Sequence, residues 1–297
     1  MARYGVATVV DDQGATAALV VADQVHPLPG RPSVIELLAD WPASVEGFEG
    51  HLQRGDLAAS GSVEQARLLA PVPQPPNLYM AGANYADHAR EMRKLPADAE
   101  VPRSPDGPFM FLKPTSTVIG HRDEVRLGSG CERVDWEVEL AAVIGRRAHR
   151  RTPADALDCV AGYTVANDVS VRDRFVRASA VEPSMKYDWF LQKGWATSCP
   201  LGPWLVPASE APGAHDAAMR LTLNGRVEQD SRTSEMIFSL AEQIAFLSAV
   251  IELVPGDVIC TGTCAGVGAG KGRFLAPGDV MVAEIEGIGA LENPVAR

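Results

Sequence analysis

The clearest alternation of apolar and polar positions lies between residues 136 and 145, where it predicts a buried strand. Successive side chains of a strand point to opposite faces, so Glu137 and Glu139 share one face and the apolar residues between them the other. A second apolar run, over residues 159–167, also predicts a strand and ends at Asp168. Two acids side by side on an apolar strand repel each other and lose solvation, and a cation between them would remove both costs.

Shorter patterns predict a small unit over roughly the first 70 residues. Its elements are strands over residues 6–9 and 17–21 and helices over residues 34–38 and 63–69. The next segment, residues 71–76, is rich in proline, which excludes helix and stiffens the chain. We therefore expect a small α+β domain over residues 1–72 and a larger domain over residues 73–297. The alternative is a single domain with an ordinary proline-rich loop.

The larger part of the chain is predicted to be rich in strands, with few long helices. Apolar residues recur at helical spacing over residues 233–253, which is the clearest helix. The other elements are strands over 78–82 and 109–113, helices over 84–92 and from Thr152, and a polar loop over 93–107. Because these strands do not alternate regularly with helices, a doubly wound parallel sheet is disfavoured, and we expect a mixed β fold with short helices.

Composition narrows the classes of partner and compartment. The chain has 297 residues, 46% of them hydrophobic, and a formal net charge of −11, which argues against nucleic acid or an anionic membrane as the main partner. Its five cysteines form no CxxC pair and favour a reduced, cytoplasmic setting. The start of the chain lacks a signal-peptide core, and no apolar run approaches the roughly 20 residues that span a bilayer.

The three acids at strand positions are a ligand set for a hard divalent cation. Carboxylate oxygens are the ligands that Mg²⁺ and Mn²⁺ prefer, so Glu137, Glu139 and Asp168 predict a metal site. The alternative is an exposed strand edge whose negative charges keep the protein soluble. The apolar residues on either side of each acid weaken that alternative.

Two further features carry candidate chemistry. His88 and Glu91 stand three residues apart on a predicted helix, and a carboxylate beside an imidazole orients it as a general base for water. Taken alone, the pair is more typical of a helix surface than of a general base. Lys193 lies among aromatic residues, where its ammonium could neutralise a substrate oxyanion, or could simply reach the surface from a strand end.

Together these residues resemble the fumarylacetoacetate hydrolase family, which includes acylpyruvases and related diketo-acid hydrolases. The matching phrases run in order from about residue 78 to 295. They are Asn84-Tyr85 with His88 and Glu91; Phe111-Leu112-Lys113-Pro114; residues 135–140; Ala161-Gly162-Tyr163; Asn167-Asp168 to Arg172-Asp173; Lys193; Gly202-Pro203-Trp204; Leu223-Asn224-Gly225; residues 255–259 with Thr261-Gly262-Thr263; and Gly266-Val267-Gly268.

The resemblance implies a β-sandwich roll of the family's C-terminal type, preceded by a small and variable N-terminal domain. It implies a homodimer that binds one Mg²⁺ or Mn²⁺ and no organic cofactor. In the family pattern, Glu137, Glu139 and Asp168 are the metal ligands. His88 and Glu91 match a water-activating pair on a helix that orders over the site when substrate binds.

The resemblance also implies the residues that meet the substrate. Lys193 matches a lysine near the reacting oxygen, and the expected substrate contacts are Tyr85, Arg172, Phe175 and Thr263. Two positions depart from the pattern. Phe175 stands where many members have a glutamine that contacts substrate, which implies a more apolar pocket wall, and Cys264 stands where many have a proline.

The expected function is hydrolysis of a C–C bond in a 2,4-diketo acid, giving pyruvate and an organic acid, within the catabolism of aromatic compounds or sugar acids. The expected partner is a small anionic keto acid. The alternative is a decarboxylase of the oxaloacetate type, or a hydratase or isomerase, acting through an enolate held at the metal. A third reading is a metal-stabilised binding protein without catalysis, which would have no need of His88, Glu91 and Lys193 together.

Overall fold

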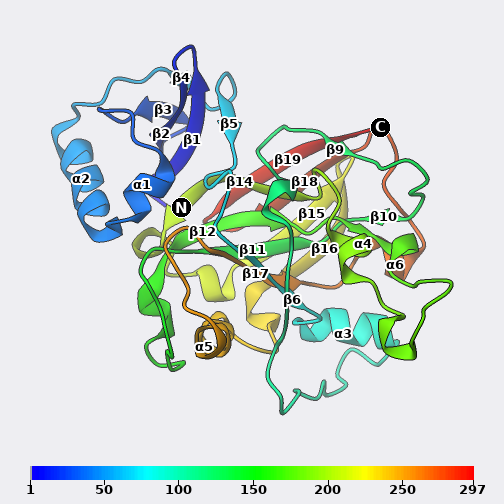
Figure 1. The fold of residues 1–297 in the computed structure, drawn as a ribbon. Coiled ribbons are helices and arrows are strands. Elements are labelled where there is room, and N and C mark those ends of the chain that lie inside the picture. Colours follow the sequence, from blue (N-terminus) through cyan, green and yellow to red (C-terminus); the bar gives the residue numbers. More distant parts are fainter. Residues whose placement is uncertain (1) are drawn as a thin grey trace.

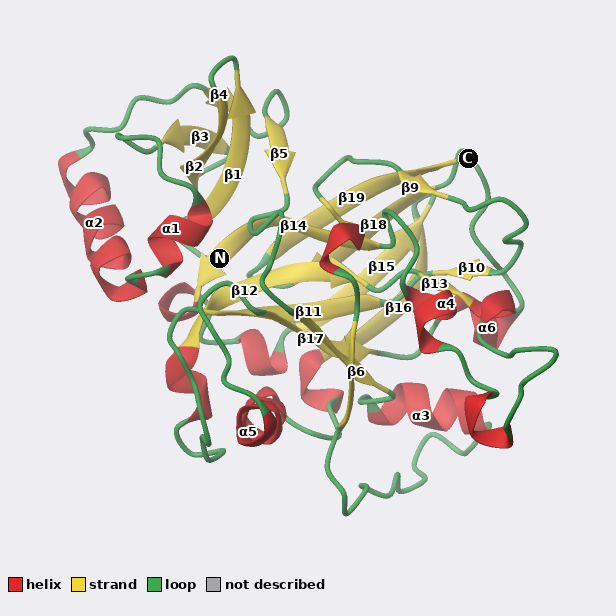
Figure 2. Ribbon diagram, in the orientation of Figure 1, coloured by secondary structure: helices red, strands yellow, loops and turns green. Residues whose placement is uncertain are grey.

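The computed structural model describes residues 2–297 and shows a β-rich protein with short helices (Figure 1; Figure 2). Its largest sheet runs in the order β4-β3-β2-β1-β14-β12-β11-β17-β6-β7. Along this path the strands are antiparallel except for β17 and β6, which are parallel. The predicted mixed β fold is therefore confirmed. The central strands are β6 (Leu78–Gly82), β7 (Phe109–Leu112), β11 (Val138–Ile144), β12 (Val160–Asn167), β14 (Cys199–Pro207) and β17 (Val258–Thr263), with β8 (Val118–Ile119) pairing beside β14.

A second sheet lies against the first and closes the core. Its order is β16-β15-β18-β19-β9, from β16 (Arg226–Arg232), β15 (Ala218–Leu223), β18 (Val280–Ile285), β19 (Gly289–Ala296) and β9 (Val125–Arg126). Val138 and Leu140 of β11 share one buried cluster with Leu221 and Met281 of this sheet. A short ladder pairs β10 (Val134–Asp135) with β13 (Ser170–Val171) at the edge of the site described below.

The first strands join the main sheet through a pairing of β1 with β14. Val6 of β1 pairs with Leu205 of β14, and the Trp41 indole donates a hydrogen bond of 2.9 Å to the Ala161 carbonyl of β12. Whether residues 1–72 form a domain of their own stays a prediction. The elements of this part are β1 (Gly5–Asp11), β2 (Gly14–Val21), β3 (Gln24–Pro27), β4 (Gly61–Ser62), β5 (Arg67–Leu69), α1 (Val34–Leu38) and α2 (Trp41–Arg54).

The remaining helices are short and lie around the sheets (Figure 2). They are α3 (Ala86–Arg93), α4 (Trp189–Lys193), α5 (Leu240–Val250) and α6 (Gly268–Lys271). Short 3₁₀ helices cover Thr115–Thr117, Ala156–Cys159, Arg172–Arg174, Pro183–Met185, Ala208–Glu210, Ala214–Asp216 and Thr233–Glu235.

Three predicted helices differ from the structure. Residues 63–69 were expected to be helical, but they end in strand β5, because Leu68 and Leu69 pair with Val9 and Thr8 of β1. The expected helix from Thr152 is a turn in which the Asp155 carboxylate accepts the Thr152 amide and hydroxyl, followed by a 3₁₀ helix. The expected helix over 233–253 is only Leu240–Val250, because Ser239 and Glu242 form a capping box at its start.

Candidate active site

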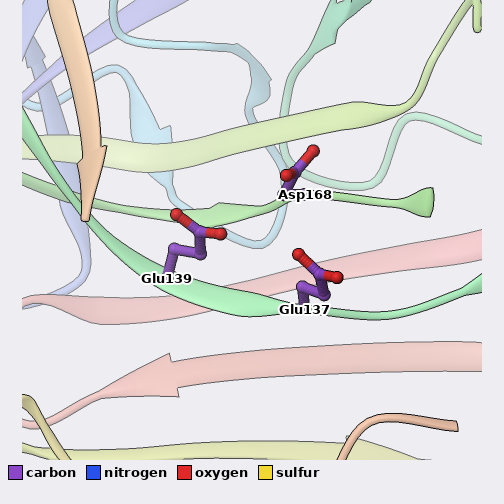
Figure 3. Close-up of side chains that lie close together, drawn as sticks. All are labelled: Glu137, Glu139 and Asp168. Atoms are coloured by element: carbon purple, nitrogen blue, oxygen red, sulfur yellow. The ribbon is translucent and has the colours of Figure 1, made fainter. Parts of the chain in front are cut away.

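The structure brings the three predicted metal ligands together at one end of the main sheet (Figure 3). Glu137 directly precedes β11, Glu139 lies within it, and Asp168 directly follows β12. Because β11 and β12 are antiparallel, the end of one meets the start of the other, and the Asp168 amide donates to the Glu137 carbonyl at 2.9 Å. All three side chains are buried, and one oxygen of each lies within 4.8 Å of the others.

Cationic side chains surround two of these three carboxylates. The Lys193 ammonium donates to Glu137 Oε2 at 2.8 Å and to Asp168 Oδ2 at 2.6 Å. Lys113 donates to Asp168 Oδ1 at 2.5 Å, and Arg172 donates to Glu137 Oε1 at 2.5 Å. Burial alone would raise the pKa of Glu137, but Lys193 and Arg172 lower it to about 2, so this acid is held as a carboxylate.

Glu139 is the acid that this arrangement leaves without a cation. It is 1% exposed, and its Oε2 accepts the Gly262 amide at 2.8 Å. Burial, followed by repulsion from Asp168 and Glu137, raises the pKa of Glu139 well above its usual range. A buried acid beside two other carboxylates is a suitable ligand for a divalent cation. The cation would offset both the cost of burying the charge and the repulsion between the carboxylates. The donor set is all oxygen, which suits Mg²⁺ or Mn²⁺.

The predicted general base lies on α3, next to this cluster. His88 Nδ1 faces Glu91 Oε2 at 3.6 Å, and His88 is near enough to Glu137 to contribute to the lowering of its pKa. Glu91 Oε2 also accepts the Gly266 amide at 3.0 Å. Burial would raise the pKa of Glu91, but His88 and this amide lower it overall, so Glu91 is held as a carboxylate that can orient the imidazole.

The four predicted substrate contacts occupy different settings. Tyr85 is fully buried at the start of α3, and Thr263 uses its hydroxyl to donate to the Val138 carbonyl at 2.7 Å. Arg172 is committed to Asp135 and Glu137. Phe175 is half-buried and packs on two other aromatic rings. Their contacts with a substrate stay predictions.

The site contains two residues for which sequence reasoning gave no role. Lys113 is 2% exposed, and besides Asp168 its ammonium donates to the Val169 carbonyl at 3.2 Å and the Ser198 carbonyl at 2.6 Å. Asp135 is fully buried and accepts Arg172 together with the amides of Gly268 and Ala269. A sequence signal existed for Lys113, because it follows Phe109 and Phe111 at the strand period of two.

Replacing Lys113 by methionine is expected to lower the free energy of unfolding by about 3–5 kcal/mol, because it removes one of the two cations that pair with the buried Asp168 carboxylate and leaves Asp168 Oδ1 and two carbonyl groups without this donor. Urea unfolding followed by circular dichroism measures the change. Lys186→Met is the matched control, since Lys186 is exposed. A loss in Lys113→Met no larger than in this control would contradict the assigned role of Lys113.

The chain is similar to known proteins both in sequence and in structure. The family profile described as Fumarylacetoacetate (FAA) hydrolase C-terminal matches residues 77–296. A mitochondrial oxaloacetate tautomerase of Xenopus laevis is 39% identical over 230 residues, which cover 77% of this chain and 68% of that protein.

Solved structures match over nearly the whole chain. The 5-carboxymethyl-2-hydroxymuconate delta-isomerase of Mycobacterium smegmatis superposes with a TM-score of 0.74 and 30% identity, covering 99% of this chain and 98% of that one. The maleylpyruvate hydrolase of Sphingobium sp. SYK-6 superposes with a TM-score of 0.77 and 27% identity, covering 98% and 99%. In residues 2–297, no helix is long and apolar enough to cross a membrane.

Proposed function

Because the chain belongs to the fumarylacetoacetate hydrolase family, we propose that it is a divalent-metal-dependent enzyme that hydrolyses a C–C bond in a 2,4-diketo acid. The products would be pyruvate and an organic acid. The observation that carries this proposal is the His88–Glu91 pair beside the buried cluster of Glu137, Glu139 and Asp168. Hydrolysis needs an activated water, and this pair is a suitable base for one.

The carboxylate cluster would hold Mg²⁺ or Mn²⁺, which when bound would act as a Lewis acid toward the oxygens of the keto acid. His88 turns Nδ1 toward Glu91, so Nε2 is the atom left to take a proton from water. That water adds to the distal carbonyl carbon. The C–C bond to the pyruvate half then breaks, and this half leaves as an enolate, which becomes the keto form by gaining on carbon the proton that His88 took from water.

Lys193 would support the oxygen that becomes negative during water addition. An ammonium group has three N–H donors, and Lys193 uses two of them on Glu137 and Asp168. The third remains for a substrate oxygen, which would be stabilised as its charge develops. Both carboxylates keep the ammonium in place before the reaction starts.

A second candidate is keto–enol tautomerisation or isomerisation of a keto acid. It is favoured by the names of two relatives, an oxaloacetate tautomerase and a 5-carboxymethyl-2-hydroxymuconate delta-isomerase. This reaction moves a proton between carbon and oxygen or between carbons, and it needs a base such as His88 but no attacking water.

We also propose that the enzyme is a homodimer and that it is cytoplasmic. The location differs within the family, since some relatives are mitochondrial.

Chelator-stripped protein is expected to lose at least about 100-fold in turnover and to regain it with Mg²⁺ or Mn²⁺. The assay uses acetylpyruvate, fumarylpyruvate and oxaloacetate, and follows pyruvate, the second acid, CO₂ and the enol absorbance separately. Pyruvate with an equal amount of a second acid supports hydrolysis. Loss or gain of the enol signal without either product supports the tautomerase. CO₂ with pyruvate means decarboxylation, and full turnover after stripping contradicts metal dependence.

A further inference from the structure

A row of aromatic residues leads from the surface to the carboxylate cluster along β7. Phe109, Phe111 and Lys113 follow each other at the strand period of two, so they share one face. Phe109 is 53% exposed, whereas Lys113 is 2% exposed and bonds Asp168. The same face therefore presents aromatic rings at its outer end and the proposed site at its inner end.

Helix α4 likewise carries an aromatic residue, Trp189, and a lysine of the proposed site, Lys193. Trp189 precedes Lys193 by four residues, which places both on one side of the helix. The Trp189 ring lies 5.1 Å from both Phe109 and Phe111, measured between ring centroids. The Lys193 ammonium lies 5.9 Å from the centroid of Phe111. The aromatic rings thus adjoin the lysine to which we give a role in the reaction.

The cluster continues outward through two more rings. Phe175 lies 5.1 Å from Trp189 and 5.0 Å from Tyr187, which is 55% exposed. We call Phe109, Phe111, Phe175, Tyr187 and Trp189 the aromatic wall. Phe109 and Tyr187 leave aromatic surface exposed at the ends of this cluster, and exposed apolar patches are typical of a binding surface. Phe175 belongs to it at the position where the family resemblance implies a polar glutamine.

One member of the wall, Phe109, also lines the cavity that contains the proposed base. Phe109 and His88 line one cavity of about 430 Å³. Its other lining residues are mostly apolar, among them Met92 and Phe238, while Arg93 and Asp106 bring opposite charges. A substrate whose reacting carbonyl lies at His88 would therefore have the ring of Phe109, the outer end of the wall, within the same cavity.

We propose that the aromatic wall binds the tail of the substrate, and that this tail is an aromatic ring or a similarly flat apolar group. This inference rests on the proposed function, since it assumes a keto acid at the carboxylate cluster. Flat rings stack on indole and phenyl side chains, whereas a carboxylate tail would lose its solvation against them. The chain would then differ in substrate from relatives whose names refer to acids with two or more carboxyl groups.

The test compares benzoylpyruvate with acetylpyruvate and with fumarylpyruvate, which carries a second carboxylate. The wild-type kcat/KM for benzoylpyruvate is expected to exceed that for each of the others by roughly tenfold or more. Trp189→Ala should remove most of this preference, and Phe175→Gln should reduce it, because kcat/KM for benzoylpyruvate should fall more than kcat/KM for acetylpyruvate in both variants. Phe190→Ala is the matched control, because Phe190 is 66% exposed and next in sequence to Trp189 but outside the wall.

Binding without reaction separates failure of this inference from failure of the proposed function. Calorimetry compares the affinities of 4-phenyl-2-oxobutanoate and 2-oxobutanoate. Neither compound has the second keto group that the cleavage reaction requires, so the difference in affinity reports on the phenyl group and the wall. Tighter binding of the phenyl compound, lost in Trp189→Ala, supports the wall even if no diketo acid is hydrolysed. Equal binding, a preference for fumarylpyruvate that depends on Arg93, or dissociation of a dimer on Trp189→Ala would each overturn it.

Discussion

Glu139→Gln is expected to abolish divalent-metal binding while making the metal-free protein more stable. The glutamine keeps the shape of the side chain and can still accept the Gly262 amide. It removes an acid whose pKa is raised by burial and by its two acidic neighbours, so the folded protein no longer has to hold that charge beside two others. Removing a residue that only hydrogen-bonds a metal ligand costs roughly 10–100-fold in metal affinity. Removing a ligand itself should therefore weaken Mn²⁺ binding at least about 100-fold. Calorimetric titration and thermal unfolding of stripped protein measure both effects.

Asp168→Asn provides the comparison that makes this result specific. It also removes a predicted ligand, but Asp168 accepts the ammonium groups of both Lys113 and Lys193. We expect the same loss of Mn²⁺ binding together with a loss of stability of about 3–5 kcal/mol, because Lys113 loses its carboxylate partner and Lys193 loses one of two. If Glu139→Gln binds Mn²⁺ as tightly as wild type, the carboxylate cluster is not the metal site.

The acidic cluster was predictable because it follows from two local rules. Alternation along a strand places Glu137 and Glu139 on one face, and the apolar run before Asp168 identifies a second strand that ends in an acid. The structure brings these residues together, as expected. Their role as ligands still depends on the binding experiment above.

The errors arose where distant pairing or a short capping signal outweighs periodicity. The apolar positions within residues 63–69 also suit a helix, but pairing with β1 makes Leu68 and Leu69 part of a strand. Ile237 continues the apolar period of α5, yet its amide donates to the Asn84 carbonyl and lies before the helix. The capping box of Ser239 and Glu242 was visible in the sequence and gives the correct start.

The cations of the site and the aromatic wall could not be assembled from sequence. Lys113 and Lys193 are 80 positions apart, and only the packing of α4 beside β7 brings both to Asp168. The same packing unites Trp189 with Phe109 and Phe111. No local pattern reports the distance between two such elements, so the wall emerges only in three dimensions.

His88→Ala is expected to lower kcat by at least about 100-fold while leaving Mn²⁺ affinity within about twofold of wild type, because a general base contributes roughly 10²–10⁴-fold and His88 is not one of the proposed ligands. Glu91→Gln should cost less, since the imidazole remains and loses only its orienting carboxylate. Steady-state kinetics with the substrate identified by the panel and calorimetry with Mn²⁺ measure the two quantities. Added imidazole should restore part of the turnover of His88→Ala, because it can take the proton in place of the missing ring.

His149→Ala is the control for removing a histidine, because His149 is exposed and follows the far end of β11 from the carboxylate cluster. It should leave kcat unchanged. The position of His88 argues that its effect is chemical: it faces Glu91 at 3.6 Å, and Glu91 in turn is held by the Gly266 amide. Near-normal turnover in His88→Ala would remove the base from the mechanism, whereas a loss that imidazole does not relieve and that is matched by weaker Mn²⁺ binding would make His88 a structural support of the metal site.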